Sequence, residues 1–187
     1  MTLKPSCAAA CLLLICSSLS AEEKGPFGGF KHDNTEAIEI TSDNLEVRQA
    51  EQLAIFTGDV IAGQGTLRLT ADQLDVFYKE KNDDAPDTGT ADTDTEAAGT
   101  GAIERLIATG NVFLSNGTET AQGERGVYDV KTGIITMEGS VILAQGENAI
   151  SGPKLEIDLN TGVGKVLGGE NSRVKSVFTP SSTDEDN

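Results

Sequence analysis

The sequence predicts an all-β fold, in which two sheets form a jelly roll or sandwich built as a stack of 29-residue repeats. Four glycines are in register: Gly110, Gly139 and Gly168 follow one another at 29 residues, and Gly58 precedes Gly110 by 52 residues, which is 29 plus 23. The segment 41–47 matches 70–76 at the same offset of 29 residues. A fixed period of this length is typical of units that stack on their neighbours and bury a shared core. We therefore expect residues 38–169 to form about four and a half repeats, with 23 residues inserted once.

A strand with one apolar face is predicted around each of the first three registered glycines. Every second residue is apolar or glycine, whereas the residues between them are mixed. The apolar positions are Ala54, Phe56, Val60 and Ala62 in the first repeat, Leu106, Ala108, Val112 and Leu114 in the second, and Ile135, Met137, Val141 and Leu143 in the third. Alternation with a period of two residues indicates a β-strand with one buried face and one solvated face.

A second strand follows in each repeat and has the same alternation. Its apolar residues are Leu45 and Val47, then Leu74, Val76 and Tyr78, and then Leu155, Ile157 and Leu159, preceded by Ile38 and Ile40, by Leu67 and Leu69, and by Ile150. Glycine-containing turns at 63–65, 116–117 and 145–146 recur in register. Because each strand has one apolar face, two sheets that receive strands from every repeat must pack face to face.

The segments outside this domain, which we place at 38–178, have different compositions. Residues 1–21 read as a signal peptide, with Lys4 at the start, an apolar run too short to span a bilayer comfortably, and small residues before a cleavage site near Ala21. All three cysteines lie in this segment, so the exported chain has none and its stability must come from its core and its backbone ladders. We expect a flexible lead-in at 22–37, a disordered acidic insertion at 80–101 and a flexible tail at 179–187.

Composition and motifs argue against several functions. The chain of 187 residues has a net charge of −16, whereas nucleic-acid binding needs clustered lysine and arginine. His32 is the only histidine and lies in the lead-in, where a solvated residue is the simpler interpretation. The segment 162–165 lacks the spacing of a phosphate-binding loop, and the acidic run 92–96 lacks the glycine and terminal glutamate of a calcium loop. We predict that the protein is not an enzyme and has no cofactor or metal.

Three stretches resemble the LptA/OstA family, whose members form the periplasmic bridge of lipopolysaccharide export. The first is 38–47, followed by 56–60 and 69–74. The later segments 108–112 and 137–141 are similar to the family's repeated strand of glycine, a polar residue and valine. The resemblance covers 38–169 and departs from the compact family pattern in the acidic insertion, which we expect to change the shape of one wall edge while leaving the fold intact.

The resemblance implies a twisted β-jelly roll with an open apolar interior that holds the acyl chains of lipid A. It also implies a head-to-tail homo-oligomer between inner-membrane and outer-membrane export proteins of the same fold. The many small residues on the apolar face, the export signal and the lack of a clear polar cap at either end of the stack favour this interpretation over a closed core. The residues that we expect to contact lipid are Ile38, Ile40, Leu45, Val47, Phe56, Val60, Leu67, Leu69, Leu74, Val76, Val112, Leu114, Met137, Val141, Leu143 and Ile157.

Three alternatives remain open from the sequence. A membrane-anchored relative of the same fold would keep an N-terminal span, whereas the apolar run here is short and is followed by a cleavage site. A carbohydrate-active β-solenoid enzyme would show clustered acids with arginine or lysine on an exposed wall. A structural β-repeat filament without ligand differs from a lipid carrier only in what it binds.

Overall fold

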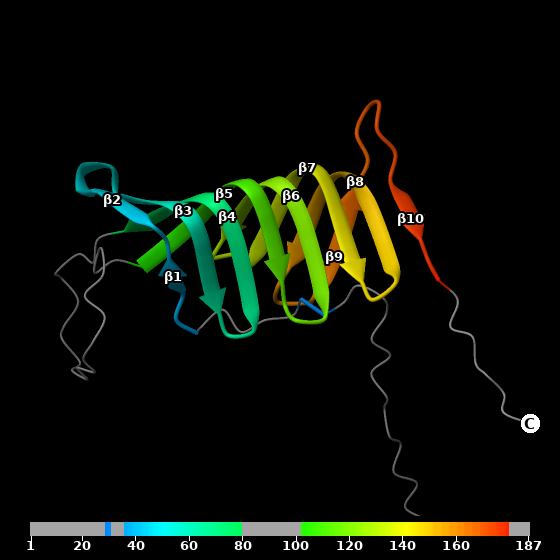
Figure 1. Ribbon diagram of the computed structural model, residues 1–187, viewed down its shortest axis with the longest axis horizontal. Coiled ribbons are helices and arrows are strands. Elements are labelled where there is room, and N and C mark those ends of the chain that lie inside the picture. The colour runs from blue at the N-terminus through cyan, green and yellow to red at the C-terminus, as the bar shows by residue number, and fades with distance from the viewer. Residues whose placement is uncertain (1–28, 31–35, 80–101, 180–187) are drawn as a thin grey trace, which may run out of the picture.

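One antiparallel sheet of ten strands makes up the fold (Figure 1). The computed structural model describes residues 29–30, 36–79 and 102–179, so the predicted signal peptide, most of the lead-in, the acidic insertion and the tail from 180 lie outside the described residues. The strands are β1 (Glu39–Thr41), β2 (Asn44–Arg48), β3 (Leu53–Gln64), β4 (Leu67–Lys79), β5 (Ala102–Ser115), β6 (Glu119–Asp129), β7 (Ile134–Gln145), β8 (Asn148–Asp158), β9 (Val163–Leu167) and β10 (Lys175–Val177). A 3-10 turn, Gln49–Glu51, joins β2 to β3. The predicted all-β class is confirmed.

The two predicted sheets are two walls of this single sheet, because each long strand crosses from one wall to the other. The sheet order is β1-β3-β4-β5-β6-β7-β8-β10, with β2 also paired to β3 and β9 also paired to β8. Neighbours in this order are consecutive strands of the chain, apart from the split strands at the two ends. Figure 1 shows the strands stacked side by side and curled over, so that the inner faces of the walls turn toward each other.

The strands bend at the registered glycines. The pairing register shifts between Thr57 and Val60 in β3, between Thr109 and Val112 in β5, and between Glu138 and Val141 in β7. The two residues inside each shift both have positive φ: Gly58 and Asp59 (84° and 41°), Gly110 and Asn111 (78° and 46°), and Gly139 and Ser140 (84° and 48°). Such a bulge increases the local twist and turns the strand. The glycine register therefore marks the corner of the folded sheet.

The fourth registered glycine does not follow this pattern. Gly168 comes directly after β9, in the segment that connects β9 to β10, and it lies outside any strand. Bulges therefore occur at the first three registered glycines, in β3, β5 and β7. The fourth glycine keeps the 29-residue spacing but forms no bulge.

The two ends of the sheet are split strands. β1 and β2 both pair with β3, and β9 and β10 both pair with β8. At each end, one of the two short strands lies in one wall and the other lies in the second wall. Together they take the place of one long bent strand that is interrupted at the corner. Among the described strands, these four have a single neighbour each, so each leaves one row of backbone groups at an edge.

The two residues that flank the insertion are direct partners, Lys79 at the end of β4 and Ala102 at the start of β5. Their strand ends are already adjacent, and loop-closure entropy changes slowly with loop length. We expect that replacing residues 80–101 by Asn-Gly leaves the β circular-dichroism spectrum unchanged and the melting temperature equal or higher. An unfolded deletion variant would show that the insertion packs on the sheet.

Candidate functional site

The inner face of the folded sheet is lined by apolar side chains along its whole length. Register partners share a face of the sheet, so they define rows of side chains that cross the strands. In one wall the row reads Leu45, Phe56, Leu74, Ala108, Gly126, Met137, Leu155 and Val166, from β2 to β9. In the other wall it reads Ile40, Ala62, Leu69, Leu114, Ala121, Leu143, Ile150 and Ser176, from β1 to β10. Apart from Ser176 in the terminal strand, both rows are apolar throughout.

At the corner, each valine of the inner face stands opposite a small residue. Val60 pairs with Ala71, Val112 with Gly123 and Val141 with Gly152. All three valines are buried. A Cβ added at Gly123 would lie 3.0 Å from the backbone oxygen of Glu138 in the neighbouring strand β7, so glycine lets these two strands pack closely at the corner.

The space between the walls is narrow in this structure. A cavity of about 50 Å³ lies among the apolar residues of β3 to β7 and Ile38, and Leu74, Leu114 and Met137 are part of its lining. An apolar cavity of about 150 Å³ is the size that accommodates a benzene molecule, so this one is too small to hold an acyl chain as it stands. The protein's own side chains fill most of the interior, and a larger apolar ligand must spread the walls.

Polar groups link the walls at the margin opposite the corner. The Tyr128 hydroxyl, at the end of β6, donates a long hydrogen bond of 3.5 Å to Gln64 Oε1, at the end of β3. Gln64 Nε2 donates to the Glu36 carbonyl oxygen at 2.7 Å. Burial, together with the neighbouring Asp129 charge, raises the pKa of the Tyr128 phenol. The phenol therefore stays neutral and able to donate at physiological pH.

A buried acid lies on the inner face at the start of β6. Glu119 has the same parity as the buried Ala121 and is itself 0% exposed. Both of its carboxylate oxygens accept from the Gly29 backbone N–H at 3.0 Å. The next residue, Phe30, is 2% exposed and belongs to the same apolar cluster as the inner face of the sheet. Gly29 and Phe30 fall within the lead-in, 22–37, that we expected to be flexible. Most of the other residues of this lead-in lie outside the described residues.

The sixteen predicted lipid contacts all lie on the inner side of the fold, with three degrees of burial. Ten are buried: Val60, Leu67, Leu74, Val76, Val112, Leu114, Met137, Val141, Leu143 and Ile157. Four are partly buried and pack against these: Ile38, Ile40, Phe56 and Leu69. Leu45 and Val47 are each 46% exposed, although they stand opposite Phe56 and Ala54. These two side chains form the uncovered end of the inner face.

The list of predicted lipid contacts left out several inner residues. Leu106, Ile135, Leu155 and Leu159 are on the apolar face that the alternation predicts and are buried, but they were not named as lipid contacts. Phe30 had no such signal, because it lies in a glycine-rich segment without alternation.

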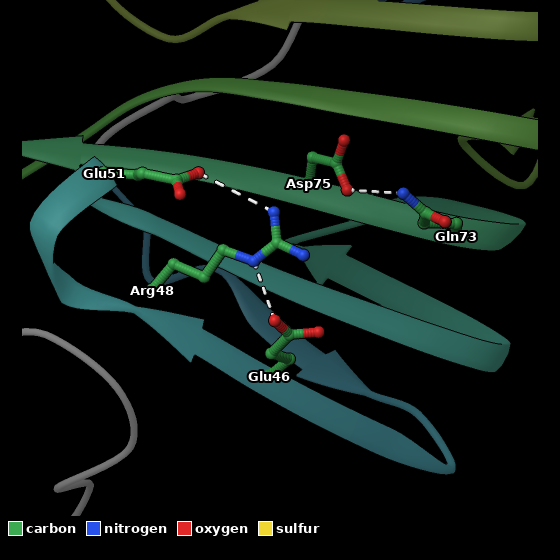
Figure 2. Close-up of polar contacts among 5 residues, drawn as sticks. All are labelled: Glu46, Arg48, Glu51, Gln73 and Asp75. Carbon is green, nitrogen blue, oxygen red and sulfur yellow. Dashed lines mark hydrogen bonds and ion pairs between the residues drawn. The ribbon is translucent and has the colours of Figure 1, made fainter.

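The outer face carries exposed carboxylates that are satisfied locally (Figure 2). Arg48 Nε lies 2.7 Å from Glu46 Oε1, and an Arg48 guanidinium nitrogen lies 3.7 Å from Glu51 Oε2. The hydrogen bond to Glu46 and the negative charge of Glu46 raise the pKa of the Arg48 guanidinium. On β4, Gln73 Nε2 donates to Asp75 Oδ1 at 2.8 Å. Exposed pairs of this kind contribute little to stability and form no acid–base constellation.

Metal ligands and membrane helices were also sought among the described residues. No group of three or more histidine, cysteine, aspartate or glutamate side chains in that part of the chain is placed to hold a metal ion. In the same ranges, no helix is long and apolar enough to cross a membrane.

Comparison with known proteins assigns the fold to a family. The family model described as LptA/(LptD N-terminal domain) LPS transport protein matches residues 39–163, from β1 to the start of β9. The chain belongs to this family. It is therefore a lipopolysaccharide-transport-related protein, in a family of transport proteins rather than enzymes.

Two similar proteins were also found. An uncharacterized protein of Rhizobium meliloti is 32% identical over 151 residues, which cover 80% of this chain and 75% of that protein. The crystal structure of LptH, the LptA-homologous periplasmic component of the lipopolysaccharide transport device of Pseudomonas aeruginosa, matches with a TM-score of 0.62. The match covers 79% of this chain and 99% of LptH at 17% identity, and it shows that the two share a fold.

Proposed function

We propose that this protein is a periplasmic lipid carrier that binds the acyl chains of lipopolysaccharide along its inner face. It passes the lipid from an inner-membrane transporter to an outer-membrane translocon. The observation that carries the proposal is the pair of apolar rows that cross the sheet from β1 and β2 to β9 and β10. The rows reach both ends of the sheet and are uncovered at Leu45 and Val47, so they offer a continuous apolar path for acyl chains.

The energetics of this binding come from apolar burial. Each methylene moved from water to an apolar surface contributes about 0.8 kcal/mol. A few acyl chains therefore bind firmly without many polar contacts, while the phosphorylated headgroup stays outside the acidic protein. The interior is nearly filled, so the walls must separate at the margin closed by Gln64 and Tyr128. The corner holds the walls together on the other side.

A pair of phenylalanines offers a matched test of lipid binding. Phe56 is partly buried on the inner face, and Phe113 is partly buried on the outer face, opposite Thr70 and Gln122. We expect that p-benzoylphenylalanine at position 56 crosslinks to lipopolysaccharide in intact cells, because it lies along the acyl path. The same residue at position 113 should give no lipid adduct.

The crosslinking experiment also decides between the carrier and a ligand-free structural filament. The small cavity of about 50 Å³ is the observation that favours the filament. Absence of a lipid adduct from both positions would end the carrier proposal. A membrane-anchored relative differs at its N-terminus, and intact mass of the exported protein separates the two: we expect cleavage near Ala21.

The ends of the sheet are suited to assembly with further copies or with partners of the same fold. Most of the exposed large apolar side chains lie in the terminal strands or next to them in the sequence: Leu45 and Val47 at one end, and Val163, Leu167, Val174, Val177 and Phe178 at the other. Unpaired edge strands recruit further strands, and two different ends make a contact that propagates head to tail. Such pairing would continue the apolar rows from one subunit into the next.

A lysine on the edge strand tests this assembly. Val177 in β10 is 52% exposed, and Ile61 in the middle of β3 is 49% exposed. Because charged edge residues oppose strand pairing, we expect Val177→Lys to weaken self-association in sedimentation velocity at least tenfold, without loss of monomer stability. Ile61→Lys adds the same charge away from the edge and should associate like the wild type. The assembly would be refuted by a wild-type protein that remains monomeric at every concentration and that forms no crosslink to a partner protein of the same fold.

A further inference from the structure

Gly29 and Phe30 form a strap that is anchored to the inner face of the sheet. In Figure 1 they are the short blue segment near the lower rim of the sheet, well separated from β1. The anchor is Glu119 at the start of β6, whose two carboxylate oxygens each accept from the Gly29 N–H at 3.0 Å. The Phe30 side chain is 2% exposed within the apolar cluster of the interior. The contact spans 90 residues of sequence, so it is a tertiary contact rather than a local turn.

Glu119 lies at the strand end of the inner face, where its register partner is Gln145. It shares the inner parity of Ala121, and its carboxylate is fully buried. A buried carboxylate is unfavourable unless hydrogen bonds satisfy it. The Gly29 N–H supplies such a bond, so the acid and the strap stabilise each other. An aliphatic residue at 119 would serve a plain core better.

The strap fits closely against this acid because residue 29 has no side chain. A Cβ at Gly29 would lie 3.0 Å from Glu119 Cδ and 3.2 Å from Asn116 Nδ2. Asn116 in turn accepts from the N–H groups of Thr118 and Glu119 at 2.9 Å and 2.7 Å, which fixes the turn between β5 and β6. A rigid turn, a buried acceptor and a glycine thus hold Phe30 in the interior.

We propose that the space filled by Phe30 is an acyl-chain subsite, which the protein's own strap occupies until a lipid chain replaces the phenyl ring. The inference rests on the proposed function and deepens it. The interior has little free space, so an incoming chain must displace something already there. A phenyl ring and a stretch of methylenes bury comparable apolar surface, so the exchange requires little net free energy. The segment is tied to the margin of the sheet by the hydrogen bond between Gly29 and Glu119 and not by strand pairing, so Phe30 can leave while the sheet remains intact.

This competition predicts opposite effects on stability and on affinity. Phe30→Ala removes a buried ring, so the free protein should melt at a lower temperature. The same change empties the subsite in advance, and binding no longer has to displace the strap, so lipopolysaccharide should bind about tenfold more tightly. Glu119→Leu should act in the same direction on affinity, whereas Glu119→Gln keeps an acceptor for Gly29 and should resemble the wild type. If the Phe30 ring had a purely structural role, Phe30→Ala would lower both the stability of the protein and its affinity for lipopolysaccharide.

A tryptophan at position 30 reports displacement directly. The chain contains no tryptophan, so Phe30→Trp gives a single tryptophan, which can be excited selectively over the two tyrosines. Titration with purified lipopolysaccharide should shift its emission to the red as the ring moves into water. Phe77→Trp, on the outer face near Arg105, is the control and should not shift.

The bound lipid is measured in parallel by the crosslink from position 56, which separates the two proposals. Lipid binding without a red shift in the Phe30→Trp variant, or with weaker binding by Phe30→Ala, overturns the subsite and leaves the carrier intact. No lipid binding by the wild type and by every variant overturns the carrier and the subsite with it. Where Phe30→Trp does not fold, Phe30→Leu and Phe30→Ala provide the affinity comparison.

Discussion

Replacing Val141 by glutamate should abolish the cooperative fold, whereas the same change at the adjacent Ile142 should leave it intact. Val141 is 0% exposed, on the inner face at the corner, and it stands opposite Gly152. Ile142 is 44% exposed, on the outer face. A glutamate at 141 would be buried without a partner, at a cost of about 3 kcal/mol or more. This is a large part of the stability of a domain, which is about 5–15 kcal/mol in total.

Urea unfolding followed by circular dichroism measures both variants under one condition. We expect Val141→Glu to be unfolded or to have a far lower midpoint, and Ile142→Glu to stay within about 0.5 kcal/mol of the wild type. If the two variants lose equal stability, the assignment of inner and outer faces at the corner is wrong. The comparison needs no ligand, so it tests the fold separately from lipid transport.

The faces of the strands could be predicted because alternation depends only on local sequence. A one-residue change of parity moves a side chain from the core to solvent, so the apolar positions of β3, β5 and β7 had a single consistent assignment. The same argument placed Val141 inside without any tertiary information. It gave inner residues of every long strand except β6, whose small and polar residues show no clear alternation.

The connection between the walls could not be predicted in the same way. Period-two alternation continues through the corner, so it does not reveal that one strand serves both walls. The first three registered glycines prove to stand at the corner, which their spacing did not reveal, and the residue after each one, Asp59, Asn111 or Ser140, also adopts positive φ. Short polar residues tolerate this conformation better than branched ones, which is a physical reason for the glycine-polar-valine pattern. Gly168 shares the spacing and has no such role, because the strand that would continue past it is split.

Phe30 shows a second limit of sequence reasoning. Its burial depends on Glu119, a residue about 90 positions away, and on a glycine that admits the contact. Neither residue stands out alone, because an acid at the start of a strand and a glycine in a polar segment are both common. A contact of this range becomes visible only when the turn between β5 and β6 has been placed. The exposure of Leu45 and Val47 is likewise a property of the end of the sheet, since their parity is that of the core.

The final prediction concerns the corner itself and compares two glycines with positive φ. Gly110, in the bulge of β5, has φ 78°, and a Cβ there would lie 2.2 Å from Asp72 Oδ2. Gly117, in the turn after β5, has φ 90°, and a Cβ there would meet nothing within 4 Å. Alanine at either site adopts an unfavourable backbone conformation, at a cost of about 1–2 kcal/mol. Only alanine at 110 also displaces Asp72, which accepts from Asn111 Nδ2 at 2.9 Å.

We therefore expect Gly110→Ala to lose about 1 kcal/mol or more of stability beyond the loss in Gly117→Ala, because the Asp72–Asn111 hydrogen bond is broken as well. Asp72→Ala removes the obstructing carboxylate, so the double variant Asp72→Ala/Gly110→Ala should be more stable than the sum of the single losses predicts. Equilibrium unfolding of the wild type, the three single variants and the double variant gives this coupling. Equal losses in the two glycine variants, with no coupling to Asp72, would mean that the corner depends on glycine for its backbone conformation alone. A positive coupling would show that the carboxylate of β4 packs against the bulge of β5 and helps to fix the angle between the two walls.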